Sequence, residues 1–242
     1  GFSFATALET VAKDFPDTKF AIVDMVVDAP NVRSVVFSEH EGSYVVGVAA
    51  AYAAKGDTVS FVGGMDIPLI SRFACGYAQG FKSVKPEGNV IVNMTGTTPT
   101  AWNDPVKGGE LTRAQKSAGS EVVFAAAGGT GLGVLQTAKD EGMLAIGVDS
   151  NQNYLQPGTV LTSMVKRVDN AVFEAFSQGT ELETGFNVMG LGNGGVGAAM
   201  DEFNAPLMTA EMTAAMADAE AKIISGEIVV HDYMSDSSCP AY

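Results

Sequence analysis

The sequence predicts an α/β protein built on parallel β-sheets. Short apolar runs alternate with stretches of helical periodicity, and glycine-rich or polar turns join them. The apolar runs are rich in β-branched residues and are nearly continuous, as expected for strands that are buried on both faces of a parallel sheet. A regular alternation of such strands with helices is typical of βαβ units.

Each element can be placed along the chain from this alternation. The expected strands are residues 20–23, 35–37, 58–62, 89–94, 121–125, 143–148 and 160–162. The expected helices are residues 5–13, 42–54, 69–83, 106–117, 131–141, 168–177 and 209–225. In the last helix, Met212, Met216, Ala219 and Ile223 recur at helical spacing, which indicates a face that packs in the core.

The chain opens on the helical pattern 5–13, without the strand that normally begins a doubly wound sheet. We therefore expect Gly1 to be an internal position of a longer protein, although a fold that begins with a helix is the alternative.

Composition excludes several classes of function. With 28 acidic and 14 basic side chains the formal net charge is -14, so no basic footprint for nucleic acid or an anionic membrane surface is expected. No run of about 20 apolar residues predicts a membrane span. The chain has 2 histidines and 2 cysteines, which gives little material for a metal site or a Ser-His-Asp triad. Cys75 and Cys239 either form one disulfide in an oxidising compartment or are unrelated thiols.

Polar and aromatic residues follow the expected strands, where open α/β sheets bind ligands. They are Asp24, the run Gly63-Gly64-Met65, Trp102, the run GGTGLG at 128–133, Asp149 and Lys166. Carboxylates accept hydrogen bonds from vicinal hydroxyls, an ammonium donates to a sugar oxygen, and an indole stacks on a ring, so this set suits a small neutral molecule with a flat ring and hydroxyl groups. No catalytic residue is predicted, because neither a G-x-S-x-G elbow nor an acid-base pair stands out.

Each of these residues also has a purely structural interpretation. Asp149 could cap the turn that follows it, Trp102 could be a core residue, and Lys166 could be a solvated charge beside Arg167. Tight strand-to-helix turns would explain the glycines, whose spacing matches neither a P-loop nor a dinucleotide-binding motif.

Five runs of the chain resemble the basic membrane protein family, the purine-nucleoside-binding lipoproteins of ABC importers. They are FSEHEGSYVVG, VSFVGGMDIPLISRFACGYAQGF, AAGGTGLGVLQTA, AIGVDSNQ and VLTSMVKRVDNAV, and they follow the family's order over essentially the whole chain. The resemblance implies a type I periplasmic binding protein fold, with two doubly wound parallel-sheet lobes around a ligand cleft.

The resemblance also implies how the lobes divide the chain. Residues 1–55 would form the first part of an N-terminal lobe that is incomplete at its start, and residues 56–163 would form the C-terminal lobe. Residues 164–242 would cross back and supply elements shared between the lobes. The family's N-terminal part, which supplies an aromatic stack and polar contacts to the base, has no counterpart in these residues.

The family pattern implies a role for each matching residue. Asp149, in a stretch similar to G-V-D-x-D-Q, would accept hydrogen bonds from the ribose hydroxyls, and Asn151 replaces the second aspartate of that pattern. Lys166, in S-x-x-K, would donate to the sugar, and Asp24 would meet the ribose from the opposite side. Trp102 stands where the family usually has phenylalanine and would stack on the base. Gly63, Gly64 and Gly128 would let the backbone approach the ligand, and Met65 and Phe73 would line the pocket.

The resemblance therefore implies an extracytoplasmic solute-binding protein that captures a purine nucleoside by hinge closure and presents it to an ABC permease in the inner membrane. We expect a monomer without a cofactor or enzymatic activity, in the periplasm or on the cell surface, with a lipid anchor left open. A binder of a free purine base or a flavin is the nearest alternative. A small-molecule sensor, or a nucleoside-processing enzyme that uses Asp24 and Asp149 as an acid-base pair, would come from other classes.

Overall fold

The computed structural model describes residues 1–242 and divides them into two compact units. The first unit comprises residues 1–38 and 166–196, and the second comprises residues 39–165 and 197–242. The chain therefore passes between the units after Ser38, Val165 and Val196. The expected lobes assign residues 39–55 to the first lobe, whereas helix α2 (Glu39–Ala53) packs along α3 (Pro68–Val84) and is grouped with the second unit.

The first unit is a small parallel sheet with two helices. Its strand order is β1 (Phe20–Val23), β2 (Val32–Phe37) and β8 (Gly185–Met189), so β1 lies at an edge. Helices α1 (Ala5–Asp14) and α6 (Val168–Gln178) complete the unit. Ala5 and Ala12 of α1 share a small core cluster with Ile22 of β1.

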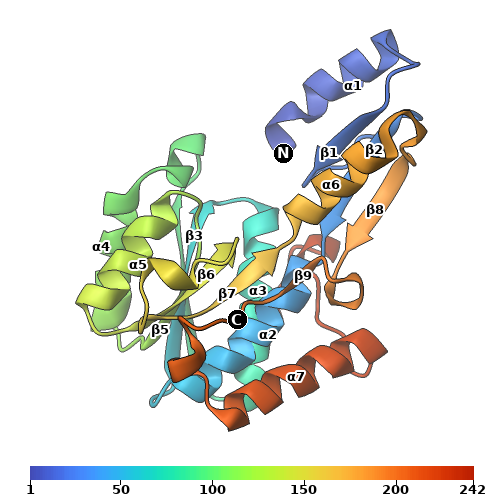
Figure 1. The fold of residues 1–242 in the computed structure, drawn as a ribbon. Helices are drawn as coiled ribbons and strands as arrows, with labels where there is room; N and C mark the ends of the chain where they lie inside the picture. The colour runs from blue at the N-terminus through green and yellow to red at the C-terminus, as the bar shows by residue number, and fades with distance from the viewer. The chain divides into compact units, whose positions relative to one another are not determined.

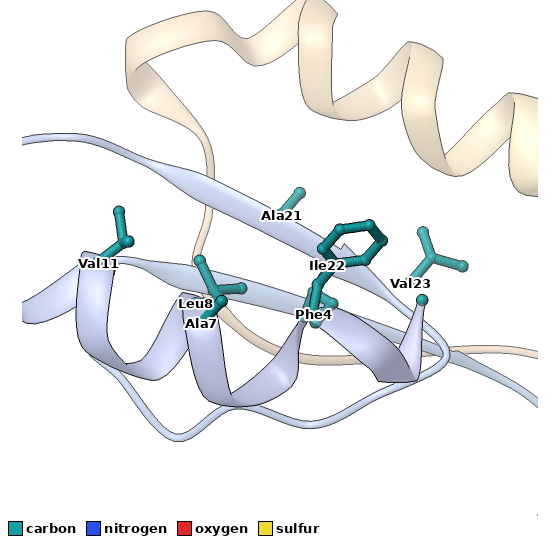
Figure 2. Close-up of a pocket in the computed structure, with 8 residues that line it drawn as sticks. Phe4, Ala7, Leu8, Val11, Ala21, Ile22 and Val23 are labelled. Carbon is teal, nitrogen blue, oxygen red and sulfur yellow. The ribbon is translucent and has the colours of Figure 1, made fainter.

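Side chains of α1 and β1 leave a pocket of about 400 Å³ in the first unit (Figure 2). Phe4, Leu8 and Val11 line it from the helical side, and Ala21 and Val23 line it from the strand. The lining is mostly apolar, so the edge strand β1 carries apolar surface that α1 covers only in part.

The second unit contains a sheet with the order β4-β3-β5-β6-β7-β9, in which the pairs from β4 to β7 are parallel. The strands are β3 (Thr58–Met65), β4 (Asn89–Gly96), β5 (Val122–Ala126), β6 (Leu144–Asp149), β7 (Val160–Lys166) and β9 (Val196–Ala198). Because chain order reverses between β3 and β5, the topological switch point of this sheet lies between those two strands.

Helices cover both faces of the second unit's sheet. The remaining helices are α4 (Pro105–Ser117), α5 (Thr130–Asp140) and α7 (Ala210–Ser225). Helices α4 and α5 pack together on one face, α2 and α3 lie on the other, and α7 packs on α2 (Figure 1). Short 3-10 helices are Phe2–Phe4, Pro99–Trp102, Asn153–Leu155, Gly179–Glu181, Leu191–Asn193, Ala205–Leu207 and Tyr233–Ser235.

The predicted α/β fold with parallel sheets is confirmed, and every expected strand and helix is present with bounds shifted by a few residues. The buried stripe of α7 is confirmed as well, since Met212, Met216, Ala219 and Ile223 are all buried. Strands β8 and β9 were not expected. The run GFNVM of β8 contains glycine and asparagine and is mostly exposed, and β9 is only 3 residues long, so neither shows the continuous apolar pattern of a central strand.

The C-terminal tail is fastened to α3 by several kinds of bond. Cys75 and Cys239 form a disulfide, which settles the open question of their pairing. One turn before Cys75, Arg72 forms hydrogen-bonded ion pairs with Asp232 and with the buried Glu39. Although burial opposes both shifts, these hydrogen bonds raise the pKa of Arg72 and lower the pKa of Asp232, so both groups stay charged.

Candidate functional site

Trp102 lies at the switch point of the second unit's sheet. A Cβ atom on Gly64, near the end of β3, would lie 2.3 Å from two carbons of the indole ring, so the ring packs directly against the Gly64 backbone. Gly128, just beyond β5, has φ of +57°, and a Cβ there would lie 3.2 Å from the Trp102 carbonyl oxygen. Trp102 therefore contacts the carboxyl ends of both strands that flank the switch point, and its side chain remains partly exposed.

Two threonines hold the backbone that carries Trp102. The hydroxyl of Thr95 on β4 lies 2.9 Å from the Ala101 carbonyl oxygen, and the hydroxyl of Thr130 donates to the same oxygen at 2.8 Å. Thr130 also accepts a hydrogen bond from the Asp104 amide at 2.7 Å. Because the loop is anchored from two neighbouring elements, the backbone on either side of Trp102 is held within the second unit.

The glycines of this region were expected to make room for a ligand, and the structure gives a different immediate reason for them. At Gly63 an added Cβ would lie 2.2 Å from the Met94 sulfur, and at Gly64 it would enter the Trp102 ring. Side chains of the same unit therefore occupy this room. Backbone contact with a ligand at Gly64 or Gly128 stays a prediction.

The structure places Met65 and Phe73 differently from each other. Met65 is the last residue of β3 and is partly buried beside Gly96 of β4. Phe73 on α3 is buried, and its ring packs against Phe124 with a centroid distance of 6.4 Å. Phe73 thus has a packing role in the core, and a contact with ligand stays a prediction for both residues.

Asp149 ends β6 in an unusual backbone conformation. Its φ is +64°, in the left-handed region that few residues other than glycine adopt, and its side chain is exposed. Gln152 closes the turn that follows. Its side-chain oxygen accepts a hydrogen bond from the Val148 backbone amide at 2.9 Å, and its backbone amide donates to Ser163 Oγ at 2.9 Å. Hydrogen bonds of Gln152 therefore hold the turn in addition to any contact of the Asp149 side chain.

Asp24 and Lys166 form an ion pair within the first unit. Asp24 follows β1 with φ of +62°, and Lys166 Nζ lies 2.5 Å from its Oδ1, close but without the alignment of a hydrogen bond. The Lys166 side chain is 5% exposed and that of Asp24 is 23% exposed. Lys166 Nζ also lies 5.0 Å from the ring centroid of Phe37. The interpretation of Lys166 as a solvated surface charge is therefore wrong.

Several supporting residues had no signal in the sequence. Thr95 and Thr130 hold the Trp102 loop, and Asp201 accepts hydrogen bonds from Asn151 and Asn153 in the turn after Asp149. The run of polar amides after Asp149 marks a turn, but Asp201 comes from far along the chain. Only the fold brings it to that turn.

Each unit by itself carries groups that can make hydrogen bonds or stacking contacts. The second unit offers an indole and a carboxylate, and the first unit offers a carboxylate paired with a buried ammonium. No group of three or more histidine, cysteine, aspartate or glutamate side chains is placed to hold a metal ion. No helix is both long and apolar enough to cross a membrane.

Comparisons with known proteins show the family and the fold of this chain. A family model described as "ABC transporter substrate-binding protein PnrA-like" (Bmp) matches residues 1–233. The "ABC transporter nucleoside-binding protein BmpA" of Lactococcus lactis is 36% identical, over 95% of this chain and 69% of the relative. A solute-binding protein of an ABC transporter from Aeropyrum pernix superimposes with a TM-score of 0.84 at 26% identity, covering 96% of this chain and 76% of the other. A structure described as a transcriptional activator of the comK gene from Bacillus halodurans gives 0.82 at 25% identity, covering 95% and 78%.

Proposed function

The chain belongs to the Bmp family of PnrA-like ABC transporter substrate-binding proteins, and we propose that it binds a purine nucleoside for delivery to an ABC permease. Its solved neighbours include ABC solute-binding proteins, and it shares with them the type I periplasmic binding fold. The proposal concerns the ligand, the residues that hold it and the way the protein closes on it.

The observation that carries this proposal is the position of Trp102. Its ring packs on Gly64 at the switch point of the sheet, which is where open α/β sheets bind ligands. One ring face lies against the backbone, and the side chain keeps partial exposure. Stacking of a base on such an aromatic ring is worth about 1–3 kcal/mol.

The carboxylates support a nucleoside rather than a nucleotide. Asp149 and Asp24 can accept hydrogen bonds from ribose hydroxyls, and Lys166 can donate to a sugar oxygen. Asp24 already neutralises the Lys166 ammonium at 2.5 Å, so no unpaired positive charge awaits a phosphate in this pair. A phosphate would meet two carboxylates in a chain of net charge -14, which disfavours it.

We propose hinge closure as the mechanism. A ligand that contacts Trp102 and Asp149 of the second unit and Asp24 and Lys166 of the first would stabilise a closed state, because only that state makes both sets of contacts.

Action in the periplasm or at the cell surface fits the Cys75–Cys239 disulfide, since such bonds persist in oxidising compartments. We expect the protein to act as a monomer.

The chain contains 1 tryptophan, so its fluorescence reports directly on the proposed site. Titration of the protein with adenosine, guanosine and inosine, excited at the red edge of indole absorption, should give a saturable change in Trp102 emission. Uridine, ribose and adenosine monophosphate should give much weaker responses. No response to any purine nucleoside, with a native-like circular dichroism spectrum, would contradict the proposal.

The same titration separates the alternatives. A free purine base or riboflavin binding more tightly than any nucleoside would identify the site as a base or flavin binder, which Trp102 would serve equally well. Release of free base during incubation would instead favour a nucleoside-processing enzyme. Mass spectrometry of any molecule that co-purifies with the native protein tests all of these ligands without a prior choice.

Two variants assign the contacts. Asp149→Ala should weaken nucleoside binding by more than about tenfold, because a carboxylate acceptor for the ribose hydroxyls is lost. Trp102→Ala, followed by calorimetry, should weaken every purine ligand whatever its sugar. A loss confined to nucleosides would contradict the stacking role.

A further inference from the structure

The turn after Asp149 is held by a carboxylate from a distant part of the chain. Asp201 Oδ2 accepts hydrogen bonds from Asn151 Nδ2 at 2.6 Å and from Asn153 Nδ2 at 3.1 Å. Its other oxygen, Oδ1, accepts from the backbone amides of Phe203 at 2.8 Å and Asn204 at 3.2 Å. One oxygen therefore closes the turn of Asp201 itself, and the other binds the turn that begins at Asp149.

The Asp201 carboxylate is suited to this role. Burial raises its pKa, but the hydrogen bond from Asn151, together with those from Phe203, Asn204 and Asn153, outweighs burial and lowers the pKa below its ordinary value. The group therefore stays ionised and acts only as an acceptor at neutral pH.

The opposite side of the turn is fixed from β7. Ser163 Oγ donates to Asn153 Oδ1 at 2.8 Å and accepts from the Gln152 amide at 2.9 Å. Asn153 is thus bonded both to Asp201 and to Ser163. Asp149 lies between the end of β6 and these hydrogen bonds. A change of its backbone from the left-handed region to the favoured region of negative φ would therefore disturb them.

We propose that Asp201 is a positioning residue for the nucleoside site, acting on Asp149 through the side chain of Asn151. This inference rests on the proposed function for its effect on binding. It gives residue 151 a requirement of its own: the side chain must donate a hydrogen bond. In this protein Asn151 Nδ2 lies 2.6 Å from Asp201 Oδ2. An aspartate at 151 would put a second carboxylate oxygen in that place, and the two carboxylates would repel each other. Asn151 and Asp201 are a matched donor and acceptor.

A donor-acceptor exchange tests the pair. Asn151→Asp should weaken nucleoside binding by about tenfold or more, because two carboxylates then repel each other, and Asp201→Asn should weaken it by about threefold to tenfold. The double variant Asn151→Asp/Asp201→Asn should bind more tightly than Asn151→Asp, because the amide at 201 can donate to the carboxylate at 151, but recovery should be partial, because that amide nitrogen no longer accepts from Asn153 Nδ2. Binding is read from Trp102 emission during titration with adenosine and guanosine.

A second measurement needs no ligand. Backbone amide hydrogen exchange at residues 148–153 should be faster in each single variant, and it should be slower in the double variant than in Asn151→Asp. Asn89→Asp is the matched control, because it adds the same charge on an exposed residue at the start of β4, the opposite end of the same sheet. That control should leave both affinity and exchange unchanged.

The outcomes separate this inference from the proposed function. Single variants with unchanged affinity and exchange, or a double variant whose losses simply add, would overturn the positioning role. If the original protein binds no purine nucleoside, the proposed function fails. The exchange data then decide the inference alone: fast exchange in the single variants with recovery in the double supports Asp201 as the anchor of the turn, and unchanged exchange overturns it.

Discussion

In each unit an aspartate in the left-handed conformation stands at the carboxyl end of a strand, and the two units stabilise this aspartate in different ways. Asp24 has φ of +62° and Asp149 has φ of +64°. In the first unit a buried lysine pairs with the carboxylate, whereas in the second unit amide groups and Asp201 hold the turn around it. The same backbone geometry can thus be fixed by one desolvated charge pair or by a network of hydrogen bonds.

The units also differ in how well they bury apolar surface. In the first unit Phe173 and Phe176 of α6 are 73% and 83% exposed, and apolar pockets flank the edge strand β1. In the second unit helices cover both faces of the sheet, and a disulfide fastens the C-terminal tail. A small sheet buries a smaller fraction of its surface, so we expect the first unit to be the less stable of the two.

The largest expected effect comes from removing the covalent link of the second unit. Cys239→Ser opens a loop closed over a sequence separation of 164 residues, which should lower the free energy of unfolding by about 3–5 kcal/mol. Thermal melting with and without a reducing agent measures this effect. Reduction should destabilise the original protein and leave Cys239→Ser unchanged. Equal melting of both proteins under oxidising conditions would show that the link contributes nothing.

Acidification should also act on the second unit through His40. Burial lowers its pKa to about 4, although Asp232 opposes that shift, and Arg72 and His231 reinforce it. Its buried Nδ1 has no hydrogen-bond partner. Between pH 6.5 and about 4 the unfolded chain therefore binds a proton that the folded chain refuses. Stability should fall across this window as pH falls, by about 3 kcal/mol.

Urea unfolding at several pH values tests that effect. His40→Gln should flatten the pH dependence between pH 6.5 and 4, and the control His231→Gln, on the C-terminal tail, should keep most of it. Identical pH profiles for His40→Gln and the original protein would exclude His40 as the source.

Breaking the charge pair of the first unit is expected to have the next largest effect. Lys166→Met leaves the Asp24 carboxylate without its partner and should lower the free energy of unfolding by about 2 kcal/mol, a moderate value because Asp24 keeps some solvent access. Arg167→Met is the matched control, since Arg167 pairs with Asp169 at 3.7 Å on the exposed surface. Equal losses in the two variants would mean that burial does not strengthen the Lys166 pair.

A single methyl group should disturb the Trp102 site. Gly64→Ala places a Cβ 2.3 Å from the indole ring, and the resulting overpacking should cost about 1–2 kcal/mol and shift the Trp102 emission. In Gly131→Ala, the control in helix α5, the new Cβ would lie at an ordinary 3.8 Å from Ala125. Emission spectra that change equally in both variants would contradict the packing of Trp102 on Gly64.

The smallest expected effect compares the two strand-terminal aspartates directly. Asp149→Gly relieves the left-handed conformation of a side-chain-bearing residue, which offsets up to about 1 kcal/mol of what its side chain contributes, so stability should change by less than about 1 kcal/mol while binding weakens. Asp24→Gly relieves the same conformation but leaves Lys166 without this carboxylate, so it should lower stability. Equal losses of stability in the two variants would remove the distinction between the units.

Much of the fold could be predicted because its strands are buried on both faces. The continuous apolar runs of β3, β5 and β6 follow from that burial, whereas the exposed strand β8 gave no such pattern. Asp24, Trp102, Asp149 and Lys166 are candidate ligand contacts because polar or aromatic residues follow apolar strands, and their contact with a ligand stays a prediction. The partners Thr95, Thr130 and Asp201 were missed because each acts through contacts with residues that are remote in sequence.

The sequence by itself determined the order of strands and helices, the residues at the strand ends and the family, because these depend on local periodicity and on which residues stand in which order. Only the tertiary structure decided the pairing of Lys166 with Asp24, the packing of Trp102 on Gly64 and the disulfide between Cys75 and Cys239. It also placed Asp201 on the turn that Asp149 begins. Such contacts join segments far apart in the chain, and their energies depend on distances and burial that no local pattern records.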